Sequence, residues 1–416
     1  MTSEIAILNK QGVAIAADSA VTVGAREKVF TSADKIFPLE NGHPVAIMVF
    51  GSAEFMGIPW ETIIKTYSKQ LGQTSFNKLE DYKTDFFKFL TKSNKIFPEN
   101  IQKICFISSV AGYYSHILNQ LRNKIYERIE SNKEITDSEI KSLLDSEITS
   151  HIDKFEKMPK ENSLSKKVRL KWGKDITKIR DKKFERHSLT EKNKKQLLKI
   201  AYYLASSTPS DVSNQLESGL VIVGFGNDDY FAKAIAPYVE HMIFGYVKCN
   251  RIKTAAISIE NDASIRPFAQ TDMVRNFMEG MDPEYQSKIN EDIKQIFKEY
   301  PEELLESIPN IAKTNKTELM KKLSKIGENE ANRYSKHLKD FRNIHYVKPV
   351  LKIVATLPKP ELAFMAESLV ALTSLKRKVT DGAETVAGPI DVAIISKGDG
   401  FCWVKKKQLD GSKKLG

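Results

Sequence analysis

"MTSEIAILNKQGVAIAADSAVTVG", residues 1–24, decides the fold of this chain. Two apolar runs, Glu4 to Leu8 and Val13 to Ala17, are joined by the turn sequence NKQG. We expect a β-hairpin, in which Gly12 can take the positive φ that such connections favour. Apolar residues occupy both odd and even positions of both runs. This pattern is typical of strands in a sheet that is covered on two faces.

The register of this hairpin brings a threonine close to an aspartate. If the four residues NKQG form the loop, Leu8 faces Val13, and Thr2 lies opposite Ser19, one position from Asp18. One residue advances a strand by about 3.3 Å, so Thr2 and Asp18 come within side-chain reach at the end of the sheet. Asp18 ends an apolar run, where a carboxylate is unfavourable unless a cation or hydrogen-bond donors accompany it. We therefore expect a basic group beside Asp18.

Two basic groups are candidates, the α-amino group of the chain and Lys35 in SADKIFPL. A small second residue generally permits removal of Met1, after which Thr2 carries both a hydroxyl and an amine with an unperturbed pKa of about 7.7 to 8.0. Such a residue is a nucleophile with its own general base. Lys35 would lower the pKa of the amine and Asp18 would orient the lysine. Gly51, after the strand HPVAIMVF, permits the close backbone approach that an oxyanion requires.

Strands and long helices alternate along the rest of the chain. The strand HPVAIMVF leads into the helix PWETIIKTYSKQLG, and charged, helix-forming sequence follows over residues 77–207. Strands return with GLVIVGFG and KTAAISIE, before a second helical stretch over residues 272–346. The end of the chain predicts a helix, PELAFMAESLVALTSLKRK, and a hairpin, IDVAIISKGDGFCWVKKK. This order favours helices inserted between parts of one sheet-based domain.

The motifs at the N-terminus resemble a known family. Thr2, then GVAIAADSA, then Lys35 before an apolar strand, then FGSAE leading into a helix are similar to the N-terminal third of proteasome β subunits and related bacterial proteasome-like subunits. These are N-terminal-nucleophile hydrolases. The match is specific over residues 2 to about 72 and architectural beyond them. The resemblance implies that Thr2 is the nucleophile, that Asp18 and Lys35 tune it, and that Gly51 forms the oxyanion hole, with no metal or organic cofactor.

The same resemblance implies accessory groups and an architecture. Ser19, Thr271 in FAQTD, and Asp381 or Glu384 in TDGAETVAGP occupy the neighbourhoods of the family's accessory serine and aspartate. The implied fold is α+β, a four-layer αββα sandwich. We expect a single domain over residues 1–416, with its core in residues 1–76, 208–271 and 347–416, and helical insertions at 77–207 and 272–346.

Composition places the chain among globular proteins. Of 416 residues, 41% are apolar and 28% are charged, which excludes a disordered chain. Three cysteines, far apart and without CxxC spacing, favour neither a disulfide framework nor a zinc site. No apolar run approaches the roughly 18 residues of a membrane span, and no leader peptide is recognisable. We expect a protein of the reducing cytoplasm that does not associate with a membrane.

The positive charge is concentrated in one segment. The whole chain carries +11, and residues 160–199 alone hold fifteen lysines and arginines against five acidic residues, a balance of +10. Trp172 and Phe184 are interleaved with these charges, so the segment is compatible with phosphate contacts and stacking on bases. The charged outer face of a long helix has the same composition. We favour a solvated face, or one that docks an acidic protein, over nucleic acid binding.

The sequence thus predicts a threonine peptidase or amidohydrolase that acts on a peptide or protein through an acyl-enzyme. We expect it to self-assemble into a homo-oligomer, and we regard an ATPase or an acidic protein as a candidate partner. The alternative is a catalytically inert scaffold or binding module of the same fold, which docks acidic partners or nucleic acid through residues 160–199. Retention of Met1 would favour the alternative, because the amine would then lie one residue from the hydroxyl.

Overall fold

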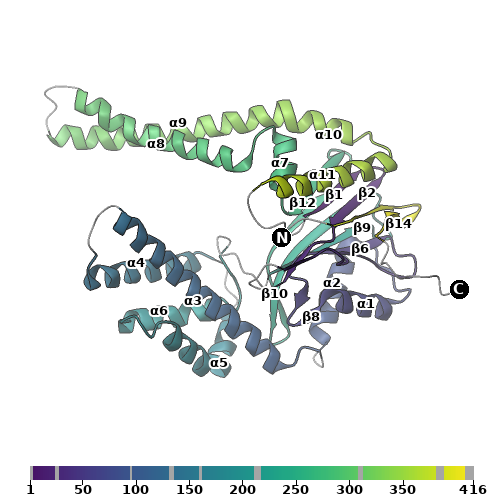
Figure 1. The fold of residues 1–416 in the computed structure, drawn as a ribbon, viewed down its shortest axis with the longest axis horizontal. Helices are drawn as coiled ribbons and strands as arrows, with labels where there is room; N and C mark the ends of the chain where they lie inside the picture. Colours follow the sequence, from purple (N-terminus) through teal and green to yellow (C-terminus); the bar gives the residue numbers. More distant parts are fainter. Residues whose placement is uncertain are drawn as a thin grey trace. The chain divides into compact units, whose positions relative to one another are not determined.

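The structure is a computed structural model that describes residues 3–23, 28–93, 96–130, 135–158, 162–209, 217–307, 313–380 and 388–407. The chain divides into two compact units. The first comprises Met1–Ala33 and Ala256–Gly416, and the second comprises Asp34–Ala255. Each unit contains an antiparallel five-stranded sheet and its own helices (Figure 1). The fold is therefore of mixed α and β structure, as the sequence predicts.

The first unit is built on a sheet of order β12-β1-β2-β13-β14. Its strands are β1 (Ser3–Asn9), β2 (Gly12–Asp18), β12 (Ala263–Ala269), β13 (Ile390–Ser396) and β14 (Gly400–Lys405). A two-stranded ribbon, β3 (Val21–Val23) and β4 (Lys28–Phe30), follows β2. The predicted hairpin register is confirmed, because Leu8 pairs with Val13 and Glu4 pairs with Ala17. Every residue of β1 and β2 is buried, as expected for a sheet covered on both faces.

Gly12 has a different role from the predicted one. Its φ is not positive, and the hairpin turn is instead stabilised by Asn9, whose side-chain oxygen accepts a hydrogen bond of 2.9 Å from the N–H of Gln11. A Cβ added to Gly12 would lie 2.6 Å from the carbonyl oxygen of Ile395 on β13. Glycine is therefore required here because two strands approach closely, and not because of the turn conformation.

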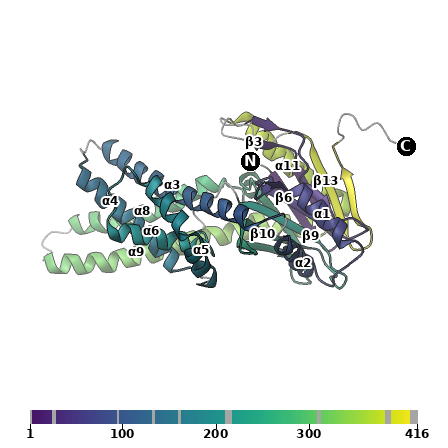
Figure 2. The same cartoon turned by 90° about the horizontal axis from the view of Figure 1, so that it is seen from below.

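One long helix covers a face of this sheet. The helix α11 (Lys359–Val379) packs its buried residues against alternate residues of β1, β2 and β13. Further helices follow β12 along the chain: α7 (Asp272–Glu279), α8 (Pro283–Ser307), α9 (Lys313–Arg342), a π-helical turn η1 (Asn343–Val347) and α10 (Lys348–Val354). Two of them, α8 and α9, form a long antiparallel hairpin (Figure 1, Figure 2). Helices α7, α8 and α9 fall on the predicted second helical stretch, residues 272–346, whereas α10 lies beyond its predicted end.

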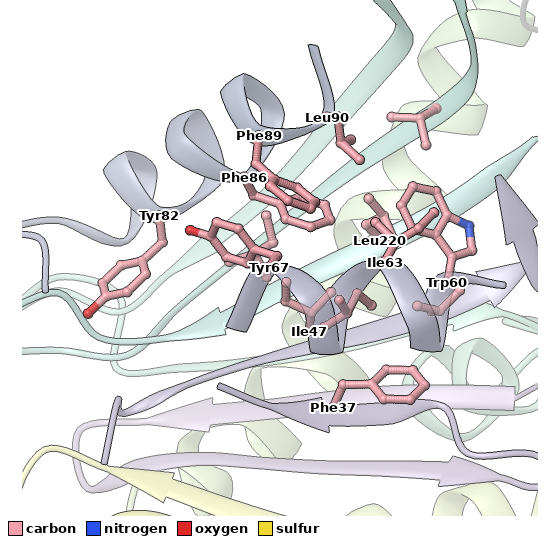
Figure 3. Close-up of a cluster of buried hydrophobic side chains, with 14 of the residues drawn as sticks. Phe37, Ile47, Trp60, Ile63, Tyr67, Tyr82, Phe86, Phe89, Leu90 and Leu220 are labelled. Atoms are coloured by element: carbon pink, nitrogen blue, oxygen red, sulfur yellow. The ribbon is translucent and has the colours of Figure 1, made fainter. Parts of the chain in front are cut away.

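The second unit is built on a sheet of order β11-β10-β9-β6-β5. Its strands are β5 (Ile36–Pro38), β6 (Val45–Gly51), β9 (Ser218–Gly224), β10 (Lys233–Ile243) and β11 (Tyr246–Ala256), and a ribbon of β7 (Glu54–Phe55) and β8 (Ile58–Pro59) follows β6. The predicted strand KTAAISIE is only half correct, since β11 ends at Ala256. Helices α1 (Trp60–Leu71) and α2 (Leu79–Lys92) cover one face with an aromatic-rich core (Figure 3).

The remaining helices of the second unit pack around a core of their own. They are α3 (Glu99–Glu130), α4 (Asp137–Glu156), α5 (Asn162–Lys183) and α6 (Glu191–Tyr203). Trp172 and Phe184 belong to this core and are each 2% exposed. The idea that they stack on nucleic acid bases is therefore wrong. Their spacing reflects the buried face of α5, whose basic residues Lys166, Lys174 and Lys178 are exposed.

Candidate functional site

Asp18 lies at the end of β2 in the first unit, and its carboxylate binds the beginning of the chain. Oδ1 accepts a hydrogen bond of 2.8 Å from the main-chain N–H of Ser3, and Oδ2 accepts one of 3.1 Å from the N–H of Ala20. The residue is 1% exposed. These main-chain donors stabilise a carboxylate at the end of an apolar strand, where the sequence predicts a basic group. The nitrogen of Ser3 is also the atom through which Thr2 is joined to the chain.

Two of the predicted accessory residues lie at the same end of this sheet. Ser19 is buried, and its hydroxyl donates to the carbonyl oxygen of Pro389 at 2.8 Å. In the ladder between β1 and β12, Ser3 pairs with Ala269, and Thr271 follows two residues later. Thr271 is half-buried, and its carbonyl accepts the N–H of Arg275 at the start of α7. Thr2, Asp381 and Glu384 lie outside the described residues.

Lys35 belongs to the second unit and directly precedes β5. It is 4% exposed, and its carbonyl oxygen accepts a hydrogen bond of 3.0 Å from the N–H of Val49 on β6. The ladder continues from there with Ile36 opposite Met48. Lys35 is therefore a buried lysine whose backbone is hydrogen-bonded to Val49, the residue two positions before Gly51 on β6.

Gly51 has the conformation that only glycine adopts without strain. Its φ is +80°, and a Cβ would lie 2.6 Å from the carbonyl oxygen of Glu217. The N–H of the next residue, Ser52, donates to that same oxygen at 3.3 Å, on the β9 side. The N–H of Val49 donates to Lys35 on the opposite, β5 side. Because N–H directions alternate along a strand, the N–H of Gly51 is directed to the side on which Lys35 lies.

The turn after Gly51 is fixed by the beginning of β9. The hydroxyl of Ser218 donates to the carbonyl oxygen of Ser52 at 3.1 Å, and the indole N–H of Trp60 donates to Ser218 Oγ at 2.8 Å. Gly51 itself pairs with Ser218 in the ladder between β6 and β9. Because these contacts hold the turn in place, the N–H of Gly51 needs no reorganisation to stabilise a developing negative charge.

A buried charge network adjoins this turn, and the sequence did not predict it. Glu240 and Lys248, both fully buried, form an ion pair of 2.8 Å, and Lys248 also donates to the hydroxyl of Thr208 at 2.6 Å. Burial by itself raises the pKa of Glu240, but Lys248, His241 and the hydrogen bond from Asn250 together outweigh it and bring the pKa to about 2. Asn250 bridges Glu240 and Glu217. Burial raises the pKa of Glu217, the residue whose carbonyl contacts Gly51.

A second missed pair lies in the first unit, near Asp18. Lys407 donates to the Asp391 carboxylate at 2.6 Å, both side chains are buried, and Lys407 also donates to the carbonyl oxygen of Ala33 at 2.8 Å. Asp391 pairs with Ala17 in the ladder between β13 and β2. The signal available in the sequence was an aspartate inside the apolar strand IDVAIIS, the same signal that identified Asp18.

No group of three or more histidine, cysteine, aspartate or glutamate side chains within the described ranges is arranged to hold a metal ion. None of the helices described has the length and apolar character needed to cross a bilayer.

Comparison with known proteins does not assign the chain. No protein-family model matches it, and neither does any curated protein.

Proposed function

We propose that this protein is an N-terminal-nucleophile hydrolase that cleaves peptide or amide bonds with Thr2. The observation that carries the proposal is the hydrogen bond from the N–H of Ser3 to Asp18. It ties the peptide that follows Thr2 to a buried carboxylate. The family resemblance supplies the rest of the assignment, with Lys35 beside the amine and Gly51 as the oxyanion donor.

The proposed architecture is the four-layer αββα sandwich. Helix α11 covers one face of the first sheet, and helices α1 and α2 cover one face of the second. Residues on the opposite faces of both sheets are buried as well, among them Ile15 of β2 and Met48 of β6. We propose that each of the two sheets, with the helices that cover it, supplies one β layer and one α layer of the sandwich.

Chain connectivity supports a role for Lys35 near Asp18. The N–H of Ala33 donates to the carbonyl oxygen of Ser19 at 3.1 Å, one residue after Asp18. Lys35 follows Ala33 by two residues, and two peptide units span at most about 7.6 Å between Cα atoms. The Lys407 ammonium, bound to the carbonyl of Ala33, holds the chain at this point.

The proposed reaction uses one residue as nucleophile and base. The Thr2 amine takes the proton of the Thr2 hydroxyl as its oxygen attacks the substrate carbonyl carbon. The N–H of Gly51 stabilises the oxyanion that forms. The C–N bond then breaks, the leaving amine takes the proton from the Thr2 ammonium, and an ester remains on Thr2. Water attacks this ester with the amine as base, which releases the acid and regenerates the hydroxyl. Lys35 keeps the amine neutral near pH 7.

Hydrolysis of a panel of fluorogenic peptide amides tests the proposal. Thr2→Ala should abolish turnover, and Thr2→Ser should retain part of it, because serine keeps both the hydroxyl and the amine. Ser3→Ala is the matched control. It removes a neighbouring hydroxyl but keeps the N–H that binds Asp18, so its activity should equal that of the wild type. An active Thr2→Ala protein would refute the proposal and favour the inert scaffold.

A further inference from the structure

The hairpin of α8 and α9 leaves an apolar face uncovered. The two helices pack where Gly327 of α9 meets Phe297 of α8, since a Cβ on Gly327 would lie 2.5 Å from the Phe297 carbonyl oxygen. Outside this seam, large apolar side chains remain 40–62% exposed. They are Tyr285, Ile296 and Tyr300 on α8 and Leu319, Ile326, Tyr334 and Phe341 on α9.

Their spacing places these residues on one stripe of each helix. On α9 they recur every seven or eight residues, and on α8 they stand eleven and four residues apart, all close to whole numbers of helical turns. From Tyr285 to Tyr300 the stripe is about 22 Å long. A helix that packs against one neighbouring helix needs only one apolar stripe. A second stripe on each helix indicates a second partner.

The two stripes lie on the same side of the hairpin. Ile296 and Ile326 each come one residue before the residue at the seam, Phe297 and Gly327. In an antiparallel pair, residues with the same offset from the seam point to the same side of the pair, because reversing the helix direction also reverses the sense of rotation. The exposed stripes therefore merge into one apolar face, which we call the hairpin face.

The charges of the two helices are opposite. Helix α8 carries seven acidic residues and three lysines, a net −4, and α9 carries nine basic and four acidic residues, a net +5. Asp292 and Glu303 flank the stripe of α8, and Lys322 and Arg333 flank that of α9. The hairpin face thus has an acidic rim and a basic rim. A surface of this kind is complementary to itself.

We infer that the hairpin face docks a second copy of this chain as an antiparallel four-helix bundle. A two-fold axis parallel to the helices places each α8 against the α9 of the second copy, whereas a perpendicular axis would place like charges together. The charges select the parallel axis. This axis keeps every residue of the second copy at the same height along the bundle as in the first copy. Within one hairpin, Phe297 lies at the same height as Gly327. Asp292 then meets Arg333 of the second copy, and Glu303 meets Lys322.

The local ion pairs of these residues do not oppose the exchange. Asp292 lies 2.7 Å from Lys288, Lys322 lies 2.7 Å from Glu318, and Arg333 lies 2.5 Å from Glu330, in exposed pairs on their own helices. Exposed pairs of this kind are weak, so Asp292, Lys322 and Arg333 remain able to pair with a second copy. The inference concerns a surface distant in sequence from the proposed site and does not depend on catalysis.

Sedimentation velocity of the full chain tests the apolar part of the inference. The wild type should sediment with at least twice the mass of Ile326→Asp, whose dissociation constant should rise more than tenfold. Leu170→Asp is the matched control, because Leu170 is an exposed leucine on α5, and this variant should sediment like the wild type. Circular dichroism should show unchanged helix content in both variants. A monomeric wild type, or an Ile326→Asp protein of unchanged mass, would overturn the inference.

Charge reversal tests the arrangement. One variant carries Asp292→Arg with Glu303→Lys, and a second carries Lys322→Glu with Arg333→Asp. Each should dissociate alone, whereas an equimolar mixture of the two should regain the wild-type mass, since each variant then supplies the charge that the other needs. A mixture that stays dissociated would contradict the pairing of α8 with α9. Binding of an unrelated acidic or basic protein to this face would not rescue the inference.

Discussion

The main-chain N–H of Ser3 donates a hydrogen bond of 2.8 Å to Oδ1 of Asp18, across the first two strands of the chain. The amide of Ser3 is the first peptide nitrogen of the sheet, and it joins the chain to Thr2. The peptide that follows the proposed nucleophile at position 2 is thus held by a buried carboxylate and not by side-chain packing alone.

Asp18→Asn should destabilise the protein by about 1–3 kcal/mol, because both carboxylate oxygens accept main-chain N–H groups and an amide nitrogen cannot replace one of them. Urea unfolding measures the change. Asp262→Asn is the matched control, since Asp262 forms an exposed pair with Lys10, and it should cost only about 0–1 kcal/mol. Equal losses in the two variants would mean that the Asp18 contacts are not structural.

Gly51→Ala should lower both stability and hydrolysis. The substitution combines a positive φ with a Cβ placed 2.6 Å from the carbonyl oxygen of Glu217, so the turn must move. Gly57→Ala separates the two effects, because Gly57 also has a positive φ but has no heavy atom within 4 Å of the added Cβ. It should show only the backbone strain, about 1–2 kcal/mol, with full activity. Peptide hydrolysis and urea unfolding of both variants measure this, and loss of activity in Gly57→Ala would contradict the account.

Lys407→Met should cost about 3–5 kcal/mol, because it leaves the Asp391 carboxylate buried without its cation and frees the carbonyl of Ala33. Activity should fall with it, since Lys35 follows Ala33 closely. The control Lys405→Met breaks a pair with the partly exposed Glu367 and should cost about 0–1 kcal/mol. Thermal unfolding distinguishes the variants, and a Lys407→Met protein as stable as Lys405→Met would show that the contacts of Lys407 with Asp391 and Ala33 do not stabilise the fold.

Acid should destabilise the second unit through His241 on β10. Burial, assisted by Lys248 and opposed by Glu240, lowers the pKa of His241 from 6.5 to about 4. Between these values the unfolded chain binds a proton that the folded protein excludes, so the free energy of unfolding should fall as the pH decreases from 6.5 to 4. The loss from this residue is at most about 3 kcal/mol.

His241→Phe tests this effect, because phenylalanine keeps the ring against Phe106 and does not titrate. The variant should lose less stability than the wild type between pH 6.5 and pH 4, measured by urea unfolding at several pH values. Some slope should remain, since burial also lowers the pKa of His151, in the bundle of α3–α6, to about 4. Identical pH profiles would contradict the assignment.

Much of the fold could be predicted because its signals are local. The hairpin register follows from two apolar runs and a short turn, and the helix from Trp60 to Leu71 follows from its apolar spacing and from Gly72 at its end. Asp18 could be identified because a carboxylate at the end of an apolar strand requires partners. The sequence located that requirement, and the structure supplied Ser3 and Ala20 as the donors.

Features that depend on distant residues could not be predicted. The sequence predicts Gly12 as a turn residue. Glycine is required there because the carbonyl oxygen of Ile395, on a strand near the other end of the chain, leaves no room for a Cβ. Trp172 reads as an aromatic among basic residues, because the helix face that buries it is not visible in composition. The partners of Lys248 and Lys407 are invisible for the same reason. The sequence alone does not distinguish a buried lysine from a solvent-exposed one.

The central claim is that Thr2 carries a reactive hydroxyl and a free amine, and covalent labelling tests it most directly. A peptide epoxyketone forms a ring with a residue that has both groups, so the intact mass should increase by one reagent, and peptide mapping should place the adduct on Thr2 of a chain that lacks Met1. A chain that keeps Met1, or one that takes up no reagent at Thr2, would contradict the account.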